Sequence, residues 1–204
     1  MTETQTRARG NGRVRALQII FVTAIATTLA ACATTTATVD YASLDSAYQP
    51  SEVTYAAADR DLAVTVRGTP FAGFDNQRLA AKVASLMAGE PGWFRANYTA
   101  TPGASARADY RVNWLFGVPA STPSRLLCDD TKPLPKVTGE TSTTVAMAGL
   151  CRRDKMLSFA VASMPATVTP DDAAFATLIR ATTRALLPNV DPNRDGRSRE
   201  DLLP

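Results

Sequence analysis

The most reactive side chains in the chain belong to three cysteines, Cys32, Cys128 and Cys151. A thiol can be acylated, can pair with a second thiol or can bind a metal as the thiolate. The chain contains no histidine. This absence excludes Ser-His-Asp and Cys-His catalysis, together with the usual zinc sites. Acylation and disulfide formation are therefore the chemistry that these cysteines most favour.

Acidic residues form two adjacent pairs, Asp129-Asp130 and Asp171-Asp172. Two carboxylates can act together in glycoside hydrolysis, but neighbouring side chains point to different sides of a strand or helix. We interpret the first pair as a solvated turn and the second as acids that favour the start of a helix. Gly-rich phosphate loops, GxSxG elbows and SxxK spacings are absent. The sequence therefore predicts a protein that is not an enzyme.

One stretch near the end of the chain matches the first half of a calcium-binding loop. Its candidate ligands are Asp191, Asn193 and Asp195, and Gly196 would permit the sharp turn. Position twelve, which should be a bidentate glutamate, is Leu202. Because these residue types also form ordinary turns and tails, we favour a polar tail and expect no metal or cofactor.

The first 31 residues have the pattern of a cleavable export signal. Four arginines precede an apolar run from Ile19 to Ala31, and small residues lead to a cysteine. The run would rise about 20 Å as a helix, which is short of the roughly 30 Å hydrocarbon core of a bilayer. A signal is therefore favoured over a transmembrane helix or a buried helix.

Leu29-Ala30-Ala31-Cys32 resembles the lipobox of bacterial lipoprotein precursors at all four positions. The resemblance implies that diacylglycerol is attached to the Cys32 thiol and that the signal is cleaved before Cys32. Two or more acyl chains give durable attachment to a membrane. Ala33 follows where an inner-membrane retention signal would place aspartate, so the outer membrane, facing the periplasm, is favoured over the inner membrane and the cell surface.

Removal of the signal leaves a formally neutral protein. Residues 1–31 hold four arginines and one glutamate, so 18 basic and 18 acidic residues remain. This balance gives no support for a nucleic-acid partner. By composition, the remainder divides into a lipid-anchored Ala/Thr/Ser-rich tether (32–58), one domain (59–188) and a polar tail (189–204).

Export also bears on the two remaining cysteines. In an oxidising compartment Cys128 and Cys151 are expected to form a disulfide, which would stabilise the fold by roughly 3.5 kcal/mol. The stretch between them contains two prolines and Gly139, which is typical of a loop. A reactive or metal-binding pair is the alternative, but it lacks a close CxxC spacing.

Periodicity within residues 59–188 predicts alternating strands and helices. Asp75 is expected to cap one helix, which Gly89 ends, and Thr169 with Pro170 is expected to begin another. The expected strands are 62–66, 93–99, 110–116 and a hairpin of 143–150 with 156–163. The order β-α-β-β-β-β-α predicts an α+β two-layer sandwich. Its mostly antiparallel sheet of four to five strands would carry two helices on one face.

Ala108-Asp109-Tyr110 enters the clearest of these strands. With the element order, it resembles the periplasmic α/β domain of penicillin-binding-protein activator and curli-assembly lipoproteins over residues 60–187. The bulky Trp114 and Phe116 depart from that pattern, which commonly has a strand glycine there, and a shared fold does not establish function.

The sequence therefore favours a non-enzymatic, membrane-anchored lipoprotein that presents its domain to an envelope protein partner in assembly or maintenance. The alternative is a periplasmic lipoprotein that binds a small apolar molecule or a glycan, and an enzyme acting on cell-wall material is a weaker third option. Such a ligand would use aromatic side chains, but packing in the core explains them more economically: Trp93, Phe94, Tyr98 and Trp114.

Overall fold

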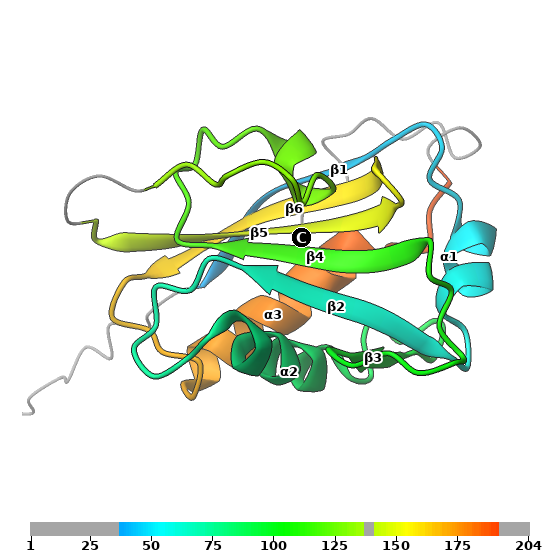
Figure 1. Cartoon of the computed structure of the whole chain (residues 1–204), viewed down its shortest axis with the longest axis horizontal. Helices are drawn as coiled ribbons and strands as arrows, with labels where there is room; N and C mark the ends of the chain where they lie inside the picture. The colour runs from blue at the N-terminus through cyan, green and yellow to red at the C-terminus, as the bar shows by residue number, and fades with distance from the viewer. Residues whose placement is uncertain (1–36, 137–140, 192–204) are drawn as a thin grey trace, which may run out of the picture. The chain divides into compact units, whose positions relative to one another are not determined.

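The computed structural model describes residues 37–136 and 141–191, which build one sheet with helices on one of its faces (Figure 1). The elements in chain order are β1 (Thr38–Leu44), α1 (Pro50–Ala57), β2 (Asp61–Arg67), α2 (Asn76–Met87), β3 (Asn97–Thr99), β4 (Tyr110–Phe116), the short 3-10 helix η1 (Ser124–Leu127), β5 (Thr143–Arg152), β6 (Lys155–Pro165) and α3 (Ala173–Leu186).

The six strands lie in the order β1-β6-β5-β4-β2-β3. β1, β6, β5 and β4 pair antiparallel, whereas β4, β2 and β3 pair parallel. Helices α2 and α3 pack on the same face (Figure 1). The predicted α+β sandwich with a mostly antiparallel sheet is confirmed. The sheet has more strands than expected, and α1 is an additional helix at one end.

β4 is central, as its alternation predicts. Its even-numbered side chains enter the main core beneath α2 and α3, where Trp114 stacks on Phe116 with ring centroids 5.7 Å apart. The odd-numbered side chains lie on the opposite face, which we call the outer face. Asn113 and Leu115 are buried there too, because residues 118–136, including η1, cover this part of the sheet. We call residues 118–136 the covering segment.

The predicted tether is wrong for most of its length. Residues 38–44 form β1 at the edge of the sheet, and residues 50–57 form α1. Tyr48, Val53 and Ala56 are buried in the main core. The Ala/Thr/Ser composition was misleading because an edge strand is held by its backbone ladder to β6, and small alanines allow close packing.

Helix ends follow the sequence in one case and differ in the other. The Asp75 carboxylate accepts from the backbone N–H of Arg78 at 2.7 Å, which confirms the predicted cap of α2. Gly89, at φ +85°, follows the end of this helix. α3, however, begins at Ala173 rather than at Pro170. The N-cap residue is Asp172, whose carboxylate accepts from both the backbone N–H and the hydroxyl of Thr169 and makes no capping hydrogen bond to the helix itself.

The remaining strands differ from prediction in extent. β3 covers only Asn97–Thr99 of the expected 93–99, and Trp93 lies before it, with its indole N–H donating to the Leu187 carbonyl at 2.8 Å. The predicted hairpin is confirmed as β5 and β6. Each strand runs further than expected, up to the turn at Arg153, which has φ +56°.

Candidate functional site

The predicted site residues fall partly outside the described part of the chain. Cys32 and the rest of the lipobox lie there, as do Asn193 and Asp195 of the calcium candidate. Asp191 is the one member of that set within the described ranges. Lipidation of Cys32 stays a prediction, and so does the expectation that the calcium-like stretch is a polar tail without a metal.

Cys128 and Cys151 form a disulfide with a Cα–Cα distance of 5.6 Å. Cys128 directly follows η1, and Cys151 lies near the end of β5. Both are buried in a small apolar cluster with Leu115, Leu127 and Met147 on the outer face. The disulfide therefore fastens the covering segment to the sheet, which is a structural role.

Two arginines on the sheet donate hydrogen bonds to backbone carbonyls of the covering segment. Arg111 on β4 donates to the Cys128 carbonyl at 3.1 Å, and Arg67 on β2 donates to the Leu126 carbonyl. Asp130 lies between them, 3.2 Å from the Arg111 guanidinium and 3.6 Å from that of Arg67. Asp130 is exposed in a turn, as the solvated-turn interpretation predicts, and its cationic partners come from strands distant in sequence.

Asp129, in contrast, belongs to a local turn. Its carboxylate accepts from the hydroxyl and the backbone N–H of Thr131. These hydrogen bonds, with Lys132 nearby, lower the pKa of Asp129 from 3.8 to about 2. The adjacent Asp129 and Asp130 thus point to different partners, and no paired-acid site forms.

The aromatic residues named for a ligand site serve packing. Trp114 is fully buried, and Tyr98 is buried with its hydroxyl donating to the Glu90 carbonyl at 2.8 Å. Trp93 and Phe94 pack edge to face against each other and against the main core. Two of the four are therefore buried, and the other two are partly buried against the core.

A different aromatic group is exposed where α1 meets the start of β4. The Tyr55 side chain is 53% exposed, and the Arg107 guanidinium lies 4.2 Å from the centre of its ring. Tyr110 packs edge to face against Tyr55, with centroids 6.3 Å apart. We call this group, together with Glu52 and Arg152, the Tyr55 cluster.

A hydrogen bond and an ion pair connect the other members of the Tyr55 cluster. The Tyr110 hydroxyl donates to Glu52 at 2.9 Å, and Arg152 forms an ion pair with the same carboxylate. Burial and the hydrogen bond to Glu52 raise the pKa of Tyr110. The Arg107 Nε is buried without a hydrogen-bond partner, so the ring of Tyr55 is a principal contact of this cation. The cluster is therefore held in place before any partner binds.

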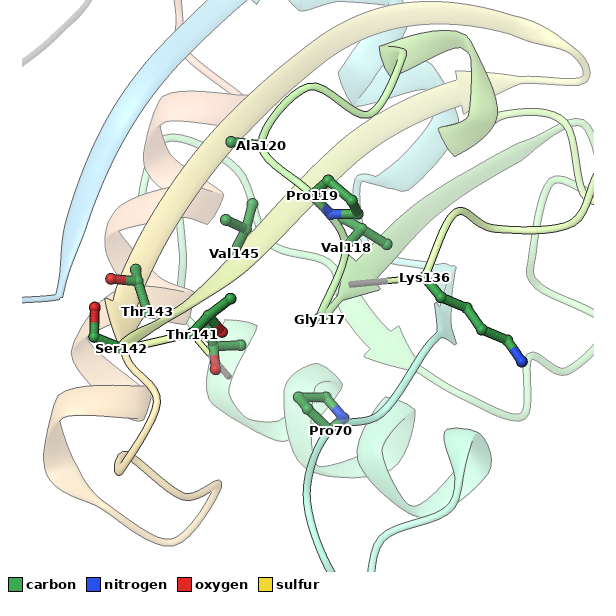
Figure 2. A pocket seen from close by; sticks show the side chains of 11 residues that line it. Pro70, Gly117, Val118, Pro119, Ala120, Lys136, Thr141, Ser142, Thr143 and Val145 are labelled. Carbon is green, nitrogen blue, oxygen red and sulfur yellow. The ribbon is translucent and has the colours of Figure 1, made fainter. Parts of the chain in front are cut away.

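A pocket of about 600 Å³ lies elsewhere on the domain (Figure 2). Its surface is mostly apolar, and its walls come from the loop after β2, the turn after β4 and the start of β5. Figure 2 shows Lys136 on one side of the pocket and Thr141, Ser142 and Thr143 on the other. The remaining lining residues are Pro70, Gly117, Val118, Pro119, Ala120, Thr144 and Val145.

Strand register sets the pocket and the Tyr55 cluster at opposite ends of the sheet. Thr38 pairs with Ser163, which pairs with Val145 of the pocket. At the other end Tyr110 pairs with Arg152. β5 spans the interval with ten residues, or about 30 Å. In Figure 1 the end of the sheet at which β1 begins lies at the left, and α1 lies at the right.

Sequence reasoning missed both features for different reasons. Tyr55 and Arg107 are separated by 52 positions, and only the packing of α1 beside β4 brings them together. The pocket is built from loops, whose paths carry no periodic signal. The one available clue was the amphipathic helix of residues 50–57, hidden in a stretch interpreted as a tether.

No helix within the described ranges is long and apolar enough to cross a membrane. Comparisons with protein families, with curated proteins and with solved structures find no match to this chain.

Proposed function

We propose that this chain is a non-enzymatic lipoprotein of the cell envelope. Cys32 anchors it through attached lipid, most favourably to the outer membrane facing the periplasm. The domain binds an envelope protein partner through the Tyr55 cluster. The observation that carries the partner proposal is Tyr55 itself, a large aromatic residue that is 53% exposed and has the Arg107 guanidinium 4.2 Å from the centre of its ring.

Residue types and order support this surface as a recognition site. Tyrosine and arginine are enriched among the residues that dominate binding energy at protein interfaces. Side chains already held by neighbours lose less conformational entropy on binding. Tyr110, Glu52 and Arg152 supply that order here.

Chain length supports the position of the cluster relative to the anchor. Thr38, the first residue of β1, lies six positions after Cys32. Fully extended, these six residue-to-residue steps span about 20 Å. Anchoring at Cys32 therefore holds the β1-start end near the membrane and directs the Tyr55 cluster, about 30 Å further along the strands, away from it.

The partner proposal is tested by photo-crosslinking in intact cells. A photoreactive amino acid replaces Tyr55 in one strain and Tyr41, the other exposed tyrosine, in a control strain. We expect one dominant envelope protein crosslinked at position 55 and not at position 41. Arg107→Ala should weaken that crosslink several-fold. Equal crosslinking at the two positions would contradict the proposed surface.

The anchor is tested separately by metabolic labelling with radioactive palmitate. Cys32→Ala should abolish incorporation into this protein, because it removes the acylated thiol. Continued labelling of the variant would contradict lipidation at Cys32.

A second candidate function is binding of a small apolar ligand, and the pocket favours it. Pockets for small molecules commonly have volumes of about 300–1,000 Å³ and mostly apolar walls. In this alternative the ligand would occupy the pocket and would not need the four aromatic residues, of which Tyr98 and Trp114 are buried and Trp93 and Phe94 are partly buried against the core.

A further inference from the structure

We propose that the pocket faces the membrane and takes an acyl chain of a membrane phospholipid. This inference rests on the proposed anchor at Cys32, but it concerns a different surface from the Tyr55 cluster. Two observations favour an acyl chain as the occupant of the pocket: the reach of the anchored chain and the chemistry of the pocket walls.

The reach of the anchored chain places the bilayer at this end of the domain. Val145 lies two strands from Thr38, or about 10 Å across the sheet. If the domain stood inverted, Thr38 would be about 30 Å from the bilayer, beyond the roughly 20 Å that residues 32–38 can span. The inverted arrangement is therefore excluded for a lipidated chain, and the pocket end stays near the lipid.

The pocket walls have the chemistry of a lipid site. Aliphatic groups of Pro70, Pro119 and Val145 offer a surface that hydrocarbon can cover. Lys136 is the only charged residue among the described residues that line the pocket. An ammonium group at one side can attract a lipid phosphate, while no described carboxylate in the lining repels it.

The pocket is formed in advance by tightly packed backbone. Gly117 has φ +63°, and a Cβ at this position would lie 3.2 Å from Pro70. Its N–H donates to the Val145 carbonyl at 3.0 Å. Val118 and Thr144 are buried beside it. Because these groups are fixed, a bound acyl chain need not first open the site.

The test uses the full lipidated protein reconstituted into vesicles of phosphatidylethanolamine and phosphatidylglycerol. A small fraction of the phosphatidylethanolamine carries a photoactivatable diazirine on its acyl chain. After illumination, mass spectrometry locates lipid adducts along the chain. We expect adducts within residues 117–120 and 141–145, and none on peptides that carry Tyr55 or Arg107.

Two exposed positions provide matched variants. Ala120→Glu introduces a carboxylate at the pocket and should reduce adducts there at least three-fold. Thr101→Glu adds the same charge in an exposed loop near β3 and should leave them unchanged. Circular dichroism checks that both variants remain folded.

Other outcomes would contradict either lipid binding in the pocket or the lipid anchor at Cys32. Adducts confined to the N-terminal peptide, or spread equally over both ends of the domain, would overturn the pocket proposal and leave the anchor intact. Failure of the protein to float with vesicles would overturn the anchor, and this inference with it. Adduct levels that Ala120→Glu leaves unchanged would show that the lipid lies outside the pocket.

Discussion

Tyr48 joins the start of the domain to its end. Its side chain is fully buried, and its hydroxyl donates to the Pro188 carbonyl at 2.6 Å. Burial raises the pKa of this phenol well above 10. A residue that the composition assigns to a flexible tether is thus part of the main core.

Replacing Tyr48 therefore tests where the domain begins. Tyr48→Ala removes a buried aromatic ring and should lower the free energy of unfolding by about 3–5 kcal/mol, measured by urea denaturation. Tyr41→Ala, at a side chain that is 41% exposed, should have a much smaller effect. Equal small effects at the two positions would contradict the assignment of residues 38–57 to the folded domain and favour a tether.

Among the elements, the covering segment depends most on a covalent bond. It has one short 3-10 helix and a small apolar cluster beneath it. The disulfide between Cys128 and Cys151 limits the freedom of this segment in the unfolded chain, which is the main way such bonds stabilise proteins.

Loss of that disulfide should lower the free energy of unfolding by roughly 2–4 kcal/mol. The measurement is urea denaturation of a Cys128→Ser/Cys151→Ser double variant against the unmodified domain. In parallel, neither thiol of the unreduced protein should react with an alkylating reagent under denaturing conditions. Alkylation of both cysteines without reduction would contradict the pairing.

β1 and α1 together define the N-terminal edge of the fold. Without them, the ladder edge of β6 and the core around Tyr48 and Val53 would be exposed. β1 itself carries an irregularity between Val39 and Tyr41, with the charged Asp40 between them. Charged residues and bulges on edge strands oppose further strand pairing, so β1 ends the sheet.

A chain that begins at residue 59 should therefore fail to fold as a monomer, whereas one that begins at residue 34 should fold. Size-exclusion chromatography and a cooperative urea transition distinguish the two. A cooperative, monomeric product from the shorter chain would show that β1 and α1 are dispensable.

At the scale of the whole molecule, the shifted pKa values belong to aspartates that titrate in acid and to tyrosines that titrate in base. Hydrogen bonds from Thr131 lower the pKa of Asp129, and a hydrogen bond from Arg153 lowers that of Asp109. Burial raises the pKa values of Tyr48 and Tyr98. The chain has no histidine, so no imidazole titrates at the intermediate pH values between these two ranges.

The free energy of unfolding should consequently be nearly constant from about pH 5 to 9. The lowered aspartate pKa values stabilise the fold above the ordinary value of 3.8, and this contribution is lost as the pH falls toward about 2. The raised tyrosine pKa values stabilise it below 10, and this contribution is lost as the pH rises further. Urea denaturation across this range checks the profile, and a steep slope near pH 6 to 7 would contradict it.

Local sequence determined much of the architecture. The alternation in residues 110–116 and the Asp75 cap lead directly to β4 and α2, because strand and helix periodicity depend on near neighbours. The pairing of Cys128 with Cys151 also followed, since only two cysteines remain once Cys32 is assigned to lipid. The lipobox is a linear motif, and its prediction needs no tertiary structure.

Only tertiary structure decided what surrounds these elements. β1 is stabilised by a distant strand, Asp130 by arginines from β2 and β4, and the Tyr55 cluster by the approach of α1 to β4. Contacts between residues far apart in sequence depend on how the chain returns to the sheet, and composition does not record that path. The same long-range geometry sets the pocket at the end of the sheet where β1 begins and the Tyr55 cluster at the opposite end.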